Sequence, residues 1–504
     1  MATLYQNLQS LVGRRTGVHF DFGQFVRDHV TRAWYLTAWL LFLTYVTVRY
    51  TAGQLAAAPL TSGVILAVWV VTVTLVVVGN LTRRHSPGVR WLKNNLYNSI
   101  TNVQITLLLV LAIVAAMRGF YSYAVVNASF ETDPDVAATL AFTGANWGAV
   151  IANLRIFAVF RFPAEHAWRI WAILIMLVVL AVPSFYVYRP GFRGRKIIRR
   201  ILTYVWLLTP IVSYVLLRGV GGEEGTLATI NPDRFWGGLL LTVIISVFAI
   251  VVSFPLGLLL ALGRRSRITG IPAWLIWGVA IVVAAWGLLT STPENVRAAR
   301  NTPELLLAYW PLLVLGLAYV FQRTFRGNVV AAFSTLYIEF VRGVPLITVL
   351  FMAIILFPIF LPPDVTIAST TRVLWGFALF SAAYLAENVR GGLQAITKGQ
   401  YEAADSLGLH TFDKYRLIIL PQALRAVIPA IVGQFIGLFK DTSLVAIVGL
   451  FDILGVANSI ASQPQWLGVR SEAYIFVAAL YYVGSAAMSS YSRRLEKRLG
   501  VGER

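Results

Sequence analysis

The chain contains no cysteine and few charged residues. Without cysteine it has no disulfide framework, no thiolate nucleophile and no cysteine-based metal site. Only 13% of its 504 residues are charged and 58% are hydrophobic, whereas a soluble domain has about 25% charged residues. This composition excludes disordered and fibrous chains and argues strongly against an ordinary cytosolic enzyme.

Motifs of several enzyme classes are also missing. The chain has no G-x-x-x-x-G-K-[ST] run, so it does not bind ATP through a Walker loop. It has no H-E-x-x-H and no G-x-S-x-G, and its five histidines are dispersed along the sequence. We therefore expect no catalytic residue, no metal and no cofactor in this chain.

Acidic residues are scarce: 22 Asp and Glu stand against 42 Lys and Arg, which gives a net charge of +20. A nucleic-acid-binding protein gathers basic residues on one face beside stacking aromatics. Here the basic residues form short clusters between apolar runs, and the aromatics lie within or beside those runs. The pattern is typical of a protein in contact with membrane lipid and indicates no nucleic-acid partner.

Long apolar runs dominate the sequence. A helix crosses a bilayer with ~20 residues, and about twelve runs have that length. They are continuously apolar, whereas the strands of a membrane β-barrel alternate. The fold class is therefore all-α, a polytopic helical membrane protein with about twelve transmembrane helices. The predicted spans lie near residues 34–50, 60–79, 100–117, 168–187, 200–217, 236–262, 272–290, 305–321, 336–361, 371–391, 423–447 and 473–491.

Basic residues follow every second span, as the positive-inside rule requires if both termini are cytoplasmic. The opposite connections are neutral, acidic or mixed, as in 130–135. Segment 153–169 departs from the scheme because it is basic where an external loop is expected, which suggests a re-entrant or interfacial segment. The cytoplasmic set comprises Arg14, Arg15, Arg27, Arg32, Arg83, Arg84, Arg90, Lys93, Arg193, Arg195, Lys196, Arg199, Arg200, Arg264, Arg265, Arg267, Arg323, Arg326, Lys398, Lys414, Arg416, Arg493, Arg494, Lys497 and Arg498.

The polar loop 392–421 carries the most informative pattern. Helix-forming residues surround Glu402, Gly408 interrupts them, and a second helix is predicted from Phe412 to Leu420, ending before Pro421. Two short helices outside the membrane would form a knob suited to a cleft in a soluble partner. From the residues alone, an ordinary solvated loop is an equal alternative.

The motif Glu402-Ala403-Ala404, followed by Gly408 and by Ile418, Leu420 and Pro421, resembles the EAA loop of ABC importer permeases. Several other segments are similar to the polar amino-acid branch of that family, and the N-terminal half resembles its extended members more loosely. These segments are Trp236 to Thr242, Ser253 to Gly257, Glu339 to Leu346, Glu387 to Gly392 and Lys440 to Leu444.

The resemblance implies a permease subunit in a bacterial cytoplasmic (inner) membrane that imports polar L-amino acids such as glutamate, glutamine or aspartate. It implies three protein partners: a cytoplasmic ATP-binding subunit, a second permease subunit that is homologous or identical, and a periplasmic or lipid-tethered amino-acid-binding protein. Glu402, Ala403, Ala404 and Gly408 would couple the chain to the ATPase. The alternatives are a secondary amino-acid transporter and an ABC permease for another small solute.

The same resemblance divides the chain. Residues 1–220 form an N-terminal extension with about five spans, 221–235 an external loop, and 236–492 a type I ABC importer transmembrane domain. A basic cytoplasmic tail, 493–504, follows. An insertion at about 268–325 departs from the family pattern. It contains two predicted spans, and a peripheral hairpin that does not cross the membrane is the alternative.

Charged residues within spans need a reason, since each costs roughly 2.5–3.5 kcal/mol on insertion scales. Glu339 and Arg342 lie three residues apart, as do Glu387 and Arg390, so each pair is predicted to share a helix face and neutralise itself. The pairs would act as gate or inter-subunit contacts, or would simply extend toward the membrane surface.

Lys440 and Asp441 end an apolar run that contains Pro429, and Thr442 and Ser443 follow. The two hydroxyls are predicted to bond backbone groups freed where the helix breaks. An adjacent cation and anion match the carboxylate and ammonium of an amino acid and suggest a substrate path. The alternative is a structural pair that caps a broken helix.

Overall fold

The computed structural model describes residues 34–56, 59–82, 91, 94–96, 99–139, 144–188, 196–222, 224–266 and 270–500, and these are helical with no β-strand. They form two compact units, Met1–Asn127 and Ala128–Arg504, which are considered separately. The basic residues predicted to be cytoplasmic before residue 34, and at 83–90, 93, 193, 195 and 267, lie outside the described residues.

The described residues of the first unit include three long helices. These are α3 (Trp34–Gln54), α4 (Pro59–Thr82) and α6 (Ile100–Tyr121), with η2 (Ser122–Val126) continuing α6. Each coincides with a predicted span. The indole N–H of Trp69 in α4 donates to the hydroxyl of Thr44 in α3 at 3.2 Å, so a polar contact connects two apolar helices.

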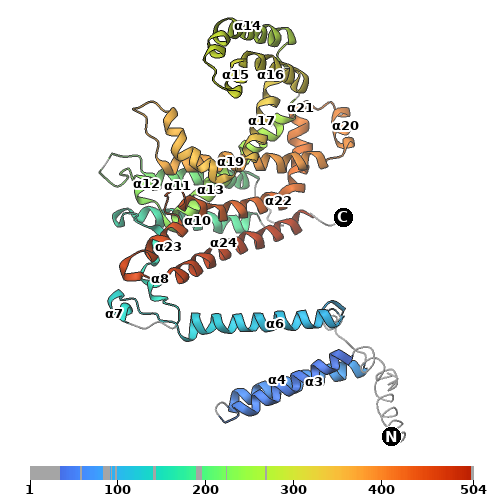
Figure 1. Ribbon diagram of the computed structural model, residues 1–504, viewed down its shortest axis with the longest axis vertical. Coiled ribbons are helices and arrows are strands. Elements are labelled where there is room, and N and C mark those ends of the chain that lie inside the picture. Colours follow the sequence, from blue (N-terminus) through green and yellow to red (C-terminus); the bar gives the residue numbers. More distant parts are fainter. Residues whose placement is uncertain are drawn as a thin grey trace. The chain divides into compact units, whose positions relative to one another are not determined.

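The second unit contains the other nine predicted spans (Figure 1). Its first part comprises α7 (Pro134–Thr139), α8 (Gly148–Ala152), α9 (Leu154–Val159), η3 (Ala164–His166), α10 (Trp168–Val187), α11 (Lys196–Arg218) and α12 (Pro232–Phe235). The rest comprises α13 (Gly238–Arg264), α14 (Ala273–Ala298), α15 (Thr302–Ala308), α16 (Trp310–Phe325), α17 (Val329–Gly343), α18 (Leu346–Phe351), η4 (Met352–Leu356), η5 (Phe357–Phe360), α19 (Ser369–Ala395), α20 (Lys398–Ser406), α21 (Thr411–Asp413), η6 (Lys414–Ile419), α22 (Leu420–Asp441), η7 (Thr442–Ala446), α23 (Ile453–Ala461), η8 (Pro464–Trp466) and α24 (Arg470–Leu499).

Two of the predicted spans are broken rather than straight. Among the described residues, seven helices are long and apolar enough to cross a membrane, and two bent pairs qualify as single spans. The span predicted at 336–361 bends by 107° between α17 and α18, where Pro345 disfavours helical geometry in the residue before it. The span predicted at 305–321 bends by 60° at Tyr309, between α15 and α16.

Helices α13 and α19 pack closely at the centre of the second unit. A Cβ at Gly257 of α13 would lie 2.7 Å from the side chain of Leu385 and 2.8 Å from the carbonyl oxygen of Ala382. Ala378, Ala382 and Ala386 of α19 are fully buried. Small residues allow this close approach, which is the usual way for apolar helices to gain packing energy in lipid.

Segment 128–235 belongs to the same compact unit as the helices from α13 onward, so the compact units divide at Asn127 rather than at the predicted boundary near residue 220. One reason is apolar packing. Phe162, Leu217 and Trp236 share a buried cluster with Leu241 of α13, and residues 149–157 share another with α23 and α24. The predicted tail also differs, because α24 continues as a helix to Leu499.

The basic segment 153–169 contains the short helices α9 and η3 and ends in the first residues of α10. Arg169 is fully buried, and its guanidinium donates to the backbone carbonyls of Thr226 and Ala228, both at 2.9 Å. The arginine thus ties the 219–231 loop to the start of α10, which gives this basic residue a structural role.

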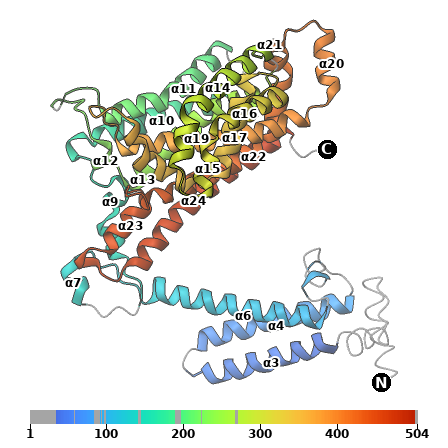
Figure 2. The same cartoon turned by 45° about the horizontal axis from the view of Figure 1, so that its top comes forward.

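The elements of the second unit separate into two ends. In both views, α20 and the end of α24 lie at one end of the helices, and α12 and α23 lie at the other (Figures 1 and 2). The EAA loop therefore lies at the same end as the basic end of α24, and the 221–235 loop lies at the opposite end.

We expect Gly257→Ala to destabilise the second unit by about 1–3 kcal/mol, because the added methyl group overpacks the α13–α19 contact. Gly278→Ala is the matched control, since a Cβ there meets nothing within 4 Å and the residue also lies in a helix. Thermal unfolding of both purified variants in detergent compares them. Equal midpoints would contradict the packing argument.

Candidate functional site

The EAA loop (residues 396–421) begins with α20, which carries the motif predicted for coupling. Glu402 and Ala403 are exposed, whereas Ala404 is fully buried. Gly408 has φ +70°, a left-handed conformation that favours glycine, and reverses the chain after α20. The carboxylate of Glu402 forms no ion pair within the described part of the chain, which leaves it available to a partner.

The second helix of the loop does not end before Pro421, so that prediction is wrong. Residues from Thr411 to Ala446 form one helical segment, with a π-helical stretch, η6, over Lys414–Ile419. Pro421 lies in the first turn of α22. In the π-helical stretch η6 the backbone hydrogen bonds join residues five apart instead of four. This shift accommodates Pro421, which has no N–H to donate. The loop is therefore continuous with a membrane-length helix.

Side-chain contacts fix the loop to the helix bundle. Tyr401 donates to the carbonyl oxygen of Leu393 in α19 at 3.3 Å and accepts from Arg265 at the end of α13 at 3.5 Å. Lys414 forms an ion pair with Asp405 that closes α20 against η6. Leu407 and Phe412 remain 73% and 71% exposed at the turn, so the apolar tip of a fixed knob is uncovered.

Next to the loop, three arginines and two glutamates form an arginine–glutamate cluster at the ends of α13, α17 and α19. Arg264 lies 2.8 Å from Glu339 and 3.6 Å from Glu387. Arg342 lies 3.6 Å from Glu387, and Arg390 forms a two-point ion pair with the same carboxylate. Glu387 thus joins three helices and is the centre of the cluster.

The cluster corrects the predicted pairing. Glu387 and Arg390 pair within α19 as expected, but Glu339 and Arg342 do not pair with each other in the described structure. Glu339 pairs with Arg264 instead, and Arg342 pairs with Glu387. The spacing of three residues does place both on one face of α17, but a neighbouring helix supplies closer partners. Arg264, which the pair-spacing argument left out, connects the two predicted pairs.

At the other end of α22, the predicted backbone bonds of the hydroxyls are confirmed. Thr442 donates to the carbonyl oxygen of Phe439 at 2.7 Å, and Ser443 donates to that of Lys440 at 2.9 Å, where the helix tightens into η7. Thr442 is buried, Lys440 is exposed and Asp441 is half-buried. The two charges form no ion pair with each other among the described residues, so both can meet a ligand.

A buried carboxylate beside this segment was missed by sequence reasoning. Asp452 is fully buried at the start of α23, where its Oδ1 accepts from the N–H of Gly455 at 2.9 Å. Its Oδ2 accepts from the hydroxyl of Tyr481 in α24 at 3.3 Å. Burial raises the pKa of Asp452 to about 6, against the lowering effect of these hydrogen bonds. The residue lies outside the candidate spans on either side of it.

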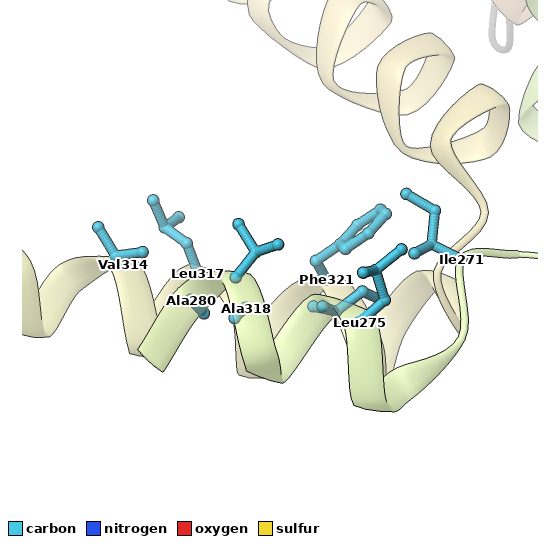
Figure 3. Close-up of a pocket in the computed structure, with 9 residues that line it drawn as sticks. Ile271, Leu275, Ala280, Val314, Leu317, Ala318 and Phe321 are labelled. Carbon is cyan, nitrogen blue, oxygen red and sulfur yellow. The ribbon is translucent and has the colours of Figure 1, made fainter. Parts of the chain in front are cut away.

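An open groove of about 400 Å³ lies between the inserted helices α14 and α16. Figure 3 shows Leu275, Val314, Leu317 and Phe321 along it, and all nine side chains that line it are apolar. A charged ammonium or carboxylate in this groove would lose water without gaining a partner, at a cost of several kcal/mol or more. The groove therefore does not suit an amino acid.

A bundle of apolar helices with a fixed polar knob at one end defines a multi-pass membrane permease. Residues 313–501 match the family described as binding-protein-dependent transport system inner membrane component. The match covers α16 to α24 and thus includes the EAA loop, most of the arginine–glutamate cluster and the Lys440 segment.

Two relatives match most of the chain. The inner membrane amino-acid ABC transporter permease protein YhdY of Escherichia coli (strain K12) is 34% identical over 413 residues, 82% of this chain and 93% of that protein. The glutamate/glutamine/aspartate/asparagine transport system permease protein BztC of Rhodobacter capsulatus is 35% identical over 426 residues, 82% of this chain and 94% of that protein. The chain belongs to this family of ABC transporter permeases, which confirms the resemblance.

The similarity to these relatives is not confined to the transport domain, because alignments of this length cannot fit within residues 236–504 and extend into the N-terminal half. Among solved structures, an amino acid ABC transporter crystallised with histidines is 26% identical, with a TM-score of 0.35, over 52% of this chain and 92% of that one.

We expect Arg264→Gln to lower the thermal unfolding midpoint, because Glu339 loses its 2.8 Å partner. The loss should be about 1 kcal/mol or less, since these side chains are partly exposed and water screens them. The effect should shrink at high salt. The neighbouring exposed Arg265→Gln serves as control, as it contacts Tyr401 and not the cluster. Equal, salt-independent midpoints would refute a role of the cluster in stability.

Proposed function

We propose that the chain is the permease subunit of an ABC importer for polar L-amino acids such as glutamate, glutamine and aspartate. The similarity to two permeases named for amino-acid transport, over more than nine-tenths of their length, carries this proposal. The substrate class follows that for which the Rhodobacter capsulatus relative is named. The chain would form the translocation path, and ATP hydrolysis would occur in a separate cytoplasmic ATP-binding subunit.

The EAA loop is the proposed coupling element. Its exposed apolar tip, Leu407 and Phe412, would enter a cleft of the ATP-binding subunit, and the unpaired carboxylate of Glu402 would meet a cation there. Tyr401 and the Asp405–Lys414 ion pair support this role, because a coupling element has to move as one body with the helices. Buried Ala404 and the reversed chain at Gly408 keep α20 against the start of the long helix that begins at Thr411.

Lys440 and Asp441 are the proposed substrate contacts at the opposite end, with Ser443 beside them. The arginine–glutamate cluster at the loop end is the proposed gate, because it joins α13, α17 and α19 through pairs that can break and reform. Both termini are proposed to be cytoplasmic, since the basic end of α24 and the EAA loop lie at one end (Figure 2).

Two further partners complete the proposed transporter in the bacterial inner membrane. A second permease subunit, homologous or identical, would form the other half of the path. A periplasmic or lipid-tethered binding protein would deliver the amino acid at the end that carries α12 and α23. The insertion α14–α16 is proposed to cross the membrane twice, because α14 and the bent pair α15–α16 both have the length and composition of spans.

We predict that Glu402→Lys abolishes amino-acid-stimulated ATP hydrolysis by the reconstituted complex, because it reverses the charge offered to the ATP-binding subunit. Glu294→Lys is the control, since it makes the same charge change at an exposed residue of α14. Purification from detergent with the ATP-binding subunit, followed by an ATPase assay with and without L-glutamate, tests the coupling. Stimulation that survives in Glu402→Lys would reject this assignment.

We predict that Lys440→Ala and Asp441→Ala each lower uptake of radiolabelled L-glutamate into proteoliposomes at least several-fold. Both variants should still co-purify with the ATP-binding subunit, because the EAA loop is unchanged. Lys497→Ala, which removes an exposed charge at the far end of α24, should transport normally. Normal uptake by both Lys440 and Asp441 variants would exclude them from the path.

A further inference from the structure

Four elements meet through hydrogen bonds around the hydroxyl of Tyr481. From α24 it lies 3.3 Å from Oδ2 of Asp452 and 3.1 Å from the hydroxyl of Thr442 in η7. Thr442 gives its own hydrogen to the carbonyl oxygen of Phe439. Tyr481 therefore donates to Asp452 when that carboxylate is ionised, and it can donate to Thr442 when Asp452 is protonated and donates to Tyr481. On the α13 side, the hydroxyl of Thr242 accepts from the N–H of Ile453 at 3.3 Å. We name the four side chains Thr242, Thr442, Asp452 and Tyr481 the Asp452 network. It is a polar chain within packing that is otherwise apolar.

The network reaches the proposed substrate contacts through Thr442, which follows Lys440 and Asp441 directly. Thr442 is buried and its hydroxyl also bonds the carbonyl oxygen of Phe439, the residue before Lys440. Neither Lys440 nor Asp441 forms an ion pair within the described residues. Ion pairs of Lys440 and Asp441 therefore do not fix this helix end. The buried hydroxyl of Thr442 provides the side-chain contact there.

Backbone contacts place α23 firmly enough to act as the fixed side of this arrangement. The N–H of Gly238, at the start of α13, donates to the carbonyl oxygen of Phe451 at 2.8 Å. Phe451 also stacks on Phe160, with ring centroids 4.9 Å apart. Asp452 is the next residue and caps α23. Its carboxylate therefore follows directly on backbone that these contacts hold in place.

We propose that Asp452 and Tyr481 are positioning residues, which hold Thr442 and the adjoining Lys440–Asp441 end of α22 in place against α23 and α24. The proposal rests on the proposed function only in assigning the amino acid to Lys440 and Asp441. A carboxylate in an apolar site is costly unless it is hydrogen-bonded, and here its bonds join the elements that flank the proposed path.

Protonation of Asp452 supplies a signature for this role. Its carboxylate accepts from the N–H of Gly455 on α23 and from Tyr481 on α24, and no ion pair in the described structure includes it. Thr242 on α13 bonds the N–H of the next residue, Ile453, and Thr442 on η7 contacts Tyr481. If the network opens, Asp452 meets water and its pKa returns from about 6 toward 3.8. Protonation therefore stabilises the closed network at acid pH, and this stabilisation is lost as the pH rises through 6.

Thiol labelling tests the positioning directly, because the native chain contains no cysteine. Val445 is fully buried in η7 and lies outside the hydrogen-bond network, so a thiol in Val445→Cys reacts only when η7 opens. Ile447 is 61% exposed two residues later, and Ile447→Cys gives a reference rate. The readout is the ratio of the two rates with a water-soluble methanethiosulfonate, on the full-length chain in detergent.

Tyr481→Phe and Asp452→Ala should each raise this ratio about three- to tenfold, the size expected when one hydrogen bond is lost. Tyr481→Phe keeps the ring and its packing, so it remains informative if Asp452→Ala unfolds. The neighbouring Tyr482→Phe is the matched control, since Tyr482 is exposed and should leave the ratio unchanged. An unchanged ratio in Tyr481→Phe overturns the proposal.

The pH dependence gives a second readout. In the parent, the ratio should rise about tenfold between pH 5 and pH 7, following the two pKa values of Asp452. Dividing by the reference rate removes the titration of the thiol itself. Asp452→Asn keeps the shape of the side chain but does not titrate, so its ratio should be flat. A tenfold rise that persists in Asp452→Asn would overturn the assignment to Asp452.

Transport separates a positioning role from a purely structural one. In the reconstituted complex, Tyr481→Phe should lower the maximal rate of L-glutamate-stimulated ATP hydrolysis several-fold while the KM for the loaded binding protein stays constant. A raised labelling ratio with a normal maximal rate would overturn the positioning role. If the unmodified complex shows no L-glutamate-stimulated ATP hydrolysis, the proposed function is refuted instead. The labelling experiment does not depend on the proposed function.

Discussion

The cost of taking a polar group out of water governs how this chain folds. In an apolar bundle, a backbone or side-chain polar group that leaves water needs a partner within the protein. Arg169 meets this need with the carbonyls of Thr226 and Ala228, and Asp452 with Gly455 and Tyr481. Backbone carbonyls in irregular segments also find partners within the protein, since Arg372 donates to carbonyls in the π-helical stretch η4. Each polar anchor therefore also determines where two elements meet.

These anchors gather at the two ends of the second unit, and between them α13 and α19 approach closely at small residues. At one end the arginine–glutamate cluster adjoins the EAA loop through the consecutive residues Arg264 and Arg265. At the other end the Asp452 network adjoins Lys440 and Asp441. Helix α13 takes part in both, and its close contact with α19 at Gly257 makes it a stiff connection. A movement of the loop would thus reach the opposite end through packed helices.

The amino-acid sequence predicts much of this architecture. Helices lie at all twelve predicted positions, because the length of an apolar run is a local property, although only seven helices and two bent pairs among the described residues have the length and composition of spans. The predicted turn at Gly408 is also present, since glycine favours its left-handed backbone without any distant partner. The errors lie elsewhere. The predicted helix end before Pro421 is wrong because a residue pattern does not reveal that a π-helical stretch precedes the proline. The predicted domain boundary near residue 220 differs from the structure because Phe162 and Trp236, on either side of it, share one buried cluster.

The sequence by itself determined the place of the long apolar helices and the resemblance to the family, because these depend on composition and on residues close together in the chain. Only the tertiary structure decided which charges pair. Glu339 lies within one turn of Arg342 but bonds Arg264, 75 positions away in sequence, and Asp452 carries no signal until Tyr481 faces it. Such pairs depend on the register of one helix against another, and that register is set by packing over many side chains at once.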